Sequence, residues 1–488
     1  MGATAAPELL RPRDRRLIAV VCAAQCLLIA VPALRGSHYI WLVSAALLTV
    51  GGMLFSANRA LLVLLATTIV LPMSLTVNVR LPAGLRPTEI LLMVTFVFLL
   101  VEVVFRRGLK VLPSSLHLPV LVFLGAAVLS GVVGIYYGND GSLIQRNLRY
   151  PLYYVVVFAV TQAVDRDSAL KIFLPLLGLA GVAVSAQYIV EFIHQSSGDT
   201  FFRVVRWQGL ILPTALLLLA NQFVHDPRRY GRLVLAALFL PTGLAFALTV
   251  GRGMWVAFMV GLSVTVWLRY IAQPLADRRA WRSILLAVGM VFSLVATVLV
   301  FQRFTGAAIT TQAVERSRTF VDYQRDVMVL SRLLGYARAL DVIAERPILG
   351  SGQGKTLTFY SFNPETNKFE TWTSWTMDSL YLALWLKMGL PGLLAFGWLC
   401  IHVLRTAWKS FRGSADPRVQ AFMSGAIAVL VANLVLGVAD GSMVTGRFAV
   451  VFGVLFGMVE VVARQSAARV AAGPEAEARG APGRATTD

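Results

Sequence analysis

The chain has 488 residues, of which 57% are hydrophobic and only 14% are charged. A soluble protein usually carries about 25% charged residues, so this composition excludes an ordinary soluble domain. The net charge of +19 could suggest nucleic-acid binding, but the basic residues lie mostly in short loops between apolar segments. No basic patch interleaved with aromatic residues accompanies them, so we expect no nucleic-acid partner.

Apolar segments recur along the chain at roughly 17–25 residues, the length that a helix needs to cross ~30 Å of hydrocarbon. Because lipid offers no hydrogen-bond partner to a free peptide group, these segments must be helical. We therefore predict an all-α polytopic protein with about 14 transmembrane helices in the lipid bilayer. The expected spans are 17–34, 38–55, 60–76, 88–105, 117–136, 150–164, 170–192, 209–224, 232–250, 253–268, 283–302, 379–402, 420–438 and 447–463.

The spans divide the chain into four parts. Residues 1–302 hold the first eleven transmembrane helices, and residues 303–378 form a long extracytoplasmic loop domain that contains amphipathic helices. Residues 379–464 hold the last three spans. The Ala-, Gly-, Glu- and Arg-rich tail 465–488 is expected to be disordered in the cytoplasm.

Positive charge in the short loops sets the expected orientation. The segment "RPRDRR" precedes the first span and keeps the N-terminus in the cytoplasm. We interpret this span as a retained helix, because no convincing small-residue cleavage site follows it. Alternating spans then place "RRGLK" (106–110) and "HDPRRYGR" (225–232) inside, and an even number of spans places the C-terminus inside too.

Arginines also occur in segments that this topology places outside, where they are normally avoided. The guanidinium group stays charged and can bind phosphate through two hydrogen bonds, so an anionic ligand on the outer face is the functional hypothesis. The alternative is that long loops escape the charge bias and some arginines contact only lipid headgroups. The outer arginines include Arg80, Arg86, Arg146, Arg149, Arg203, Arg206, Arg252, Arg316, Arg318, Arg325, Arg332, Arg338 and Arg346.

The segment "LGSGQGKT" (349–356) resembles a nucleotide-binding loop, but Leu349 replaces the first glycine of that motif. It follows an amphipathic helix expected over 331–347 rather than a strand. We therefore interpret Gly350, Gly352 and Gly354 as a tight turn that closes this helix against the membrane, and predict no nucleotide cofactor. The histidines have no spacing suited to a metal, and "DRD" (165–167) is more simply a solvated turn, so no metal is predicted.

Two outer segments present arginine near the membrane. In "LTVGRGMWVAF" (248–258), Arg252 interrupts an apolar run between two glycines, which allow a ligand or backbone to approach closely; an interfacial arginine reaching headgroups is the alternative. In "GDTFFRVVRWQG" (198–209), Arg203 and Arg206 would share one face of a helix. For this pair, ligand binding and membrane anchoring both remain open.

The segment "TMDSLYLALWLKMGLPG" (376–392) carries two charges at the start of an expected span. Asp378 could simply cap the helix. Lys387 follows in the same helix and would lie about 13 Å deeper, at a cost of ~2.5 kcal/mol or more in lipid. We therefore predict that Lys387 faces an internal polar cavity, with Asp440 as a possible counter-ion.

Several of these segments share an order and topology with a known family. The loop helix has Arg332 and Tyr336 four residues apart and is followed by "RPILGSGQG" and "DSLYLALWLKMGLPG"; "LRPTEILLM" (85–93) and "TVGRGMW" come earlier. Over about residues 80–465 the chain resembles the O-antigen ligase and Wzy-type polymerase superfamily of bacterial membrane glycosyltransferases.

The resemblance implies a C-type glycosyltransferase architecture with its active site on the outer face of the bacterial inner (cytoplasmic) membrane. The donor would be a glycan on undecaprenyl pyrophosphate, transferred with inversion and without a metal or other cofactor to a hydroxyl of an acceptor glycan or glycolipid. A surface polysaccharide (O-antigen or exopolysaccharide) polymerase is the leading hypothesis. A ligase that transfers finished polymer to a terminal acceptor, and a flippase or transporter of the lipid-linked oligosaccharide, are the alternatives.

Position by position, Arg252 matches the arginine of the family's "SR-G" motif, and Arg203 or Arg206 matches the arginine of the preceding outer loop. Asp378 stands where ligases have the histidine of "HN-x-YL", and Lys387 replaces the usual glutamate; both departures leave the ligase assignment open. The resemblance thus implies Asp378 as catalytic base and Arg252 as a second catalytic group. Arg203, Arg206, Arg332, Arg338 and Lys387 are the implied substrate-binding residues.

An aspartate is a weak base in water. If Asp378 removes the acceptor proton, we expect its carboxylate to be buried, because burial disfavours the charged form and makes the carboxylate a stronger base.

Overall fold

The computed structural model describes residues 57–70, 86–106, 111–195, 207–226, 231–272, 280–306, 309–311, 314, 327–363, 366 and 368–480. The expected spans 17–34 and 38–55 lie outside the described residues. So do Arg203 and Arg206, and the segment 71–76 of the third expected span.

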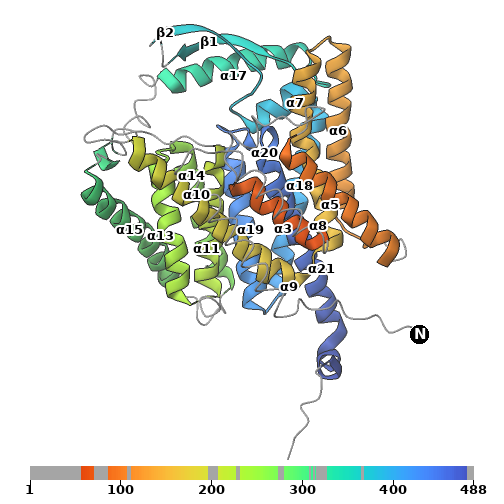
Figure 1. The fold of residues 1–488 in the computed structure, drawn as a ribbon, viewed down its shortest axis with the longest axis vertical. Helices are drawn as coiled ribbons and strands as arrows, with labels where there is room; N and C mark the ends of the chain where they lie inside the picture. Colours follow the sequence, from red (N-terminus) through yellow and green to blue (C-terminus); the bar gives the residue numbers. More distant parts are fainter. Residues whose placement is uncertain are drawn as a thin grey trace, which may run out of the picture.

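The described chain is almost entirely helical and forms a bundle (Figure 1). The first part of the bundle comprises α3 (Ala57–Val70), α5 (Pro87–Val101), the π-helix η2 (Glu102–Arg106), α6 (His117–Tyr136), α7 (Gly141–Leu152), the 3-10 helix η3 (Tyr153–Val155), α8 (Val156–Ala163), α9 (Arg166–Ser168), the π-helix η4 (Ala169–Phe173) and α10 (Leu174–Gln195). The second part comprises the 3-10 helix η5 (Trp207–Leu210), α11 (Ile211–His225), α13 (Arg232–Leu248), α14 (Arg252–Ala272), α15 (Ala280–Thr305), α17 (Val327–Glu345), α18 (Leu380–Gly413), α19 (Pro417–Leu436), α20 (Ser442–Thr445) and α21 (Phe448–Gly480).

Seven helical segments in the described part of the chain are long and apolar enough to cross a membrane. They are His117–Tyr136, Arg166–Gln195, Arg252–Ala272, Ala287–Thr305, Leu380–Gly413, Pro417–Leu436 and Phe448–Arg469; α3, α11 and α13 are shorter apolar helices. This confirms a helical, polytopic type of chain, whereas the total of fourteen spans stays a prediction. The helix α6 begins and ends at the predicted residues.

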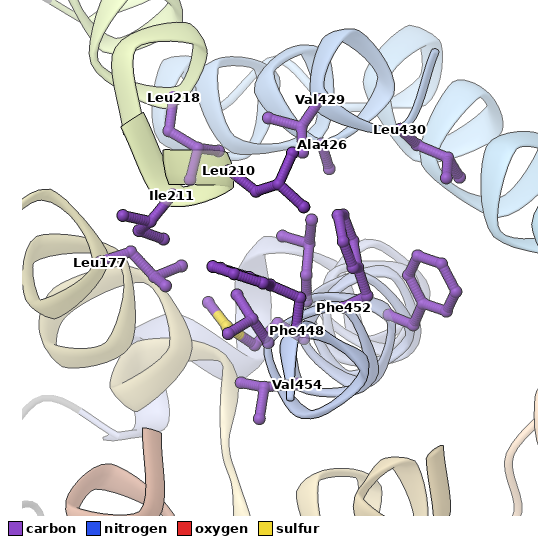
Figure 2. Close-up of a cluster of buried hydrophobic side chains, with 14 of the residues drawn as sticks. Leu177, Leu210, Ile211, Leu218, Ala426, Val429, Leu430, Phe448, Phe452 and Val454 are labelled. Carbon is purple, nitrogen blue, oxygen red and sulfur yellow. The ribbon is translucent and has the colours of Figure 1, made fainter. Parts of the chain in front are cut away.

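The core of the bundle lies where α10, α11, α19 and α21 meet. Figure 2 shows leucine, isoleucine, valine and phenylalanine side chains from these helices pointing toward one another. Phe452 and Val429 are 1% and 0% exposed, and α11 and α19 pack along much of their length. Because both helices are buried on nearly every face, they position the loops at their ends firmly.

The long loop contains a strand pair that the sequence analysis did not predict. Strand β1 (Leu357–Asn363) pairs antiparallel with β2 (Lys368–Ser374), with Leu357 opposite Ser374. The hairpin packs on α17, and together they lie across one end of the bundle (Figure 1). We call this end the hairpin side. The predicted amphipathic helix over 331–347 is confirmed as α17, which extends from Val327 to Glu345.

The glycine-rich turn after α17 attaches the loop to α6. Gly350, Gly352 and Gly354 have φ values of 68°, 78° and 83°, which favour glycine. The backbone of Gln353 packs on Gly134 of α6, and its N–H donates to the Ser130 carbonyl at 2.9 Å. The interpretation of this segment as a tight turn is therefore confirmed.

We expect Gly134→Ala to destabilise the protein by about 1–3 kcal/mol, because overpacking at a close contact forces the backbone apart. A Cβ atom at position 134 would lie 2.3 Å from the Gln353 carbonyl oxygen. Gly125→Ala is the matched control on the same helix, since a Cβ there meets nothing within 4 Å. Thermal unfolding in detergent measures both, and equal unfolding temperatures would contradict the close contact.

The end of the chain also differs from expectation. The helix α21 continues past residue 465 to Gly480, where we expected disorder. Alanine, glutamate and arginine are strong helix formers, so a helix that starts in the bundle can extend through this composition. Residues 481–488 lie outside the described part of the chain.

Candidate functional site

A charged cluster forms on the hairpin side, where α17 meets the start of α18. Arg332 Nε of α17 lies 3.3 Å from Asp378 Oδ2, and the two side chains are 46% and 60% exposed. Asp378 immediately precedes Ser379, whose hydroxyl accepts from the Leu382 N–H and caps α18. The capping alternative for Asp378 is therefore wrong, because Ser379 is the N-cap of α18. The Asp378 carboxylate pairs with Arg332 instead.

Tyr336 fixes this cluster to the end of α19. It lies one turn after Arg332 on α17, so the two side chains share a helix face. Its hydroxyl donates to the carbonyl oxygens of Asp378 and Val438, at 3.0 Å each. Burial raises the pKa of Tyr336, so the phenol remains a hydrogen-bond donor and joins α17, α18 and the loop after α19.

A second carboxylate, Asp440, lies beside the Arg332–Asp378 pair. Burial raises its pKa, and the nearby Asp378 carboxylate raises it further, against the hydrogen bonds from Ser442 and the charge of Arg332. Asp440 Oδ1 accepts from the Ser442 N–H at 2.7 Å. The site thus combines an exposed carboxylate, a half-buried carboxylate and a guanidinium group.

The exposure of Asp378 corrects one expectation. We expected burial to make this carboxylate a stronger base, yet its side chain is 60% exposed and paired with Arg332. Asp440, the other acid of the site, is half-buried. Sequence reasoning considered Asp440 only as a counter-ion, because nothing local shows that the loop after α19 returns to Asp378.

Arg252 begins α14 near the same end of α19. A Cβ atom on Gly253 would lie 3.2 Å from Leu436, the last residue of α19. The Gly437 carbonyl in turn accepts from the Leu380 N–H at 2.7 Å. Arg252 and Asp378 therefore flank one short segment, although they belong to helices far apart in the sequence.

Strained backbone precedes Arg252. Val250, between α13 and α14, has φ 45° and is 3% exposed. A β-branched residue in this left-handed region costs roughly 1–3 kcal/mol, and such strain is typical of functional sites. The turn that carries Arg252 is thus held in a conformation that the sequence disfavours locally.

Lys387 lies near the end of the first segment of α18. The helix is broken two residues later, at Gly389, which has φ 65° and ψ −169°. Gly389 contacts the backbone of Ile348, whose carbonyl accepts from the Leu390 N–H at 2.9 Å. Residues 380–388 therefore form a separate short helix.

The ammonium group of Lys387 binds the segment that leads to Asp378. Its Nζ donates to the Trp375 carbonyl at 2.8 Å, and the residue is 5% exposed. No ion pair between Lys387 and Asp440 occurs among the described residues. Lys387 thus supports the backbone before Asp378 rather than pairing with the predicted counter-ion.

Other predicted residues lie away from the cluster. Arg338 points to Asp341 on its own helix, at 3.9 Å, and both side chains are largely exposed. In the "DRD" segment, Asp165 caps α9 and Asp167 pairs with Lys171 and Arg469, while buried Arg166 binds Asp416. That segment is thus a structural junction, more tightly packed than the solvated turn we expected.

An apolar groove runs along α14 from a point one turn after Arg252. Its volume is about 650 Å³, and its walls are almost entirely apolar. Trp255 and Val256 follow Arg252 by three and four residues, so the groove continues the helix face on which the arginine lies. The lining residues are Trp255, Val256, Met259, Val260, Ser263, Val264 and Trp267.

Taken together, the geometry suits an amphipathic anion and an incoming hydroxyl. Guanidinium groups bind phosphate oxygens in a forked arrangement, and a carboxylate within hydrogen-bond reach can remove a hydroxyl proton. The apolar groove beside Arg252 can take a hydrocarbon chain. The charged groups lie on the hairpin side, near the C-terminal end of α19, and the groove runs from there along α14.

Part of the chain matches a known family. Residues 236–397 match the family model described as O-antigen ligase, a range of about a third of the chain that includes Arg252, Arg332 and Asp378. No curated protein matches the chain. Over this range the match confirms the resemblance to the superfamily, whereas the roles of the site residues stay predictions.

Proposed function

We propose that the chain is a membrane glycosyltransferase of the O-antigen ligase and Wzy-type superfamily, because residues 236–397 match the O-antigen ligase family model. It transfers a glycan from undecaprenyl pyrophosphate to a sugar hydroxyl of an acceptor, as a polymerase of a surface polysaccharide in the bacterial inner membrane. The observation that carries this proposal is the Arg332–Asp378 pair beside Asp440, next to the Arg252 turn and its apolar groove.

In the proposed mechanism the diphosphate of the donor binds Arg252 and Arg332. Binding draws Arg332 away from Asp378 and leaves that carboxylate free to accept a proton. The Asp440 carboxylate lies beside this base, and repulsion from the Asp378 carboxylate helps to raise the pKa of Asp440. Arg203 and Arg206, outside the described residues, remain proposed as further diphosphate ligands.

The chemical step is a substitution at the anomeric carbon of the donor glycan. The acceptor oxygen attacks the anomeric carbon from the side opposite the leaving group, and its proton passes to Asp378. A new carbon–oxygen bond forms while the bond between the anomeric carbon and the phosphate oxygen breaks. Undecaprenyl pyrophosphate leaves with the electron pair, and the guanidinium groups stabilise the charge that develops on it.

A ligase is the second candidate, because the matching family model carries that description. A ligase would transfer finished polymer to a terminal acceptor. Deleting the gene and separating the cell's glycans on a gel distinguishes the two. Loss of long chains with single units still attached supports a polymerase, whereas long chains that accumulate on the lipid carrier support a ligase. Units trapped on the inner leaflet would instead indicate a flippase and contradict the proposal.

The groove on α14 predicts a dependence on the length of the lipid chain. We expect Val260→Trp to fill the groove and raise KM for an undecaprenyl-linked donor about tenfold, a loss of ~1.4 kcal/mol. KM for a donor with a two-isoprene chain should not change, because that chain is too short to lie along the groove. Steady-state kinetics with both donors measures the effect.

The control for this experiment is Val288→Trp on α15, which adds the same bulk at an exposed apolar position outside the groove. It should leave both KM values unchanged. An equal rise of KM for long and short donors in Val260→Trp would show that the groove does not hold the chain.

A further inference from the structure

Four arginines surround Tyr150 on the hairpin side, and we call them the arginine cluster: Arg86, Arg146, Arg149 and Arg447. Arg86 Nη1 donates to the Tyr150 hydroxyl at 3.0 Å, and its guanidinium also lies over the ring. Arg146 and Arg149 precede Tyr150 on α7. Arg447 lies close enough for its charge to interact with Tyr150, and burial lowers its pKa to about 10.

Within the described part of the chain, Glu89 forms an ion pair with one member of this cluster, Arg149. Its Oε1 lies 3.1 Å from Arg149, and the two side chains are 12% and 13% exposed. The same carboxylate also accepts from the Arg86 N–H and the Tyr153 hydroxyl, so both of its oxygens already have partners. The guanidinium groups of Arg86 and Arg146 contact aromatic rings instead.

The arginine cluster is therefore strongly positive and partly buried, and its Glu89 carboxylate is already paired with Arg149. Removing charged groups from water costs several kcal/mol per ion unless an opposite charge compensates. An anionic ligand would supply that compensation and would gain charge-assisted hydrogen bonds from the guanidinium forks.

Unused hydrogen-bond donors lie in the same place. Asn147 is 5% exposed, and within the described ranges its Nδ2 has no hydrogen-bond partner. Arg146 Nε is likewise buried without an acceptor. Asn147 precedes Tyr150 by one turn on the buried face of α7, so its side chain belongs to the cluster. A buried donor without an acceptor costs about 1–3 kcal/mol, which a bound phosphate oxygen would remove.

The cluster adjoins the Asp378 site without coinciding with it. The Arg146 guanidinium lies 3.8 Å from the centre of the Trp375 ring, three residues before Asp378. The helix α5, which begins just after Arg86, exposes Met93, Val97 and Leu100 along its length. A lipid beside α5 could therefore place its headgroup at the arginine cluster.

We propose that the arginine cluster is a second binding site for a polyprenyl pyrophosphate headgroup and holds the acceptor glycan on its own lipid carrier. The inference rests on the proposed function, in which Arg252 and Arg332 bind the donor. A polymerase joins two substrates that both carry this headgroup, so it needs two such sites. The second site thus favours the polymerase over the ligase.

The test is the number of undecaprenyl pyrophosphate molecules that the purified full-length chain binds in phosphatidylcholine nanodiscs, measured by native mass spectrometry. We expect two per chain for the wild type. The double variant Arg86→Gln/Arg146→Gln should bind one, and so should Arg252→Gln/Arg332→Gln. Arg405→Gln, an exposed arginine near the other end of α18, is the matched control and should bind two.

Arg149 is left unchanged in these variants, because its removal would leave the largely buried Glu89 carboxylate without its ion-pair partner. Thermal unfolding verifies that each variant is folded. Two molecules bound by Arg86→Gln/Arg146→Gln would overturn the inference and leave the proposed function intact. If the wild type binds one molecule and both double variants bind none, the chain has a single site. That result would also overturn the inference. If phosphatidylglycerol displaces the second molecule, the site accepts any anionic lipid, and the inference of a polyprenyl pyrophosphate site is overturned. If the wild type binds no undecaprenyl pyrophosphate at all, the proposed function is overturned as well.

Discussion

Asp378→Asn is expected to lower kcat for glycan transfer by about 10²–10⁴, the range that a positioned general base contributes. Asparagine keeps the size of the side chain and can still accept a hydrogen bond from Arg332, but it cannot take up the acceptor proton. Binding of the donor should change little, so the effect should fall on kcat rather than on KM. The measurement is the rate of glycan transfer by purified protein at saturating donor.

Asp440→Asn is the companion variant. Asp440 is half-buried beside Asp378, and in the proposed mechanism it lies next to the base without touching the substrate. We therefore expect a smaller loss of kcat than for Asp378→Asn. The reverse order, with transfer abolished by Asp440→Asn and nearly normal in Asp378→Asn, would make Asp440 the base.

Arg252→Ala and Arg332→Ala are each expected to lower kcat/KM by about 10²–10³, because each removes a charged donor from the developing diphosphate. Lysine at either position should recover only part of the loss, since an ammonium group lacks the planar fork of arginine. Arg405→Ala, near the other end of α18, is the control for lost positive charge. Wild-type kcat/KM in Arg252→Ala and in Arg332→Ala, with normal membrane insertion, would refute the assigned roles.

Much of the helical scaffold could be predicted from apolar segments alone. The helix α6 has the predicted limits of 117–136 because its apolar run is continuous and polar residues bound it. The break at Gly389 could not be predicted in this way. It depends on backbone contact between Gly389 and Ile348, which are far apart in sequence and meet only when the long loop returns to α18.

The site was predictable where local spacing determines it. Arg332 and Tyr336 lie four residues apart on one helix, so their common face follows from helical periodicity. Asp440 could not be assigned to this site, because its position depends on how α18 and α19 pack and on the Leu380–Gly437 hydrogen bond. The arginine cluster has a similar origin. Arg86, Arg146 and Arg149 were visible as unusual outer arginines, whereas Arg447 was not, and their approach to Tyr150 depends on the packing of α5, α7 and the start of α21.

The most direct test of the central claim is the release of undecaprenyl pyrophosphate when purified protein is mixed with a lipid-linked glycan and an acceptor. The account predicts that wild-type protein releases one carrier molecule for each new glycosidic bond, and that Asp378→Asn releases almost none. Carrier release at the wild-type rate by Asp378→Asn, or no release by the wild type with either a lipid-linked or a terminal acceptor, would contradict it.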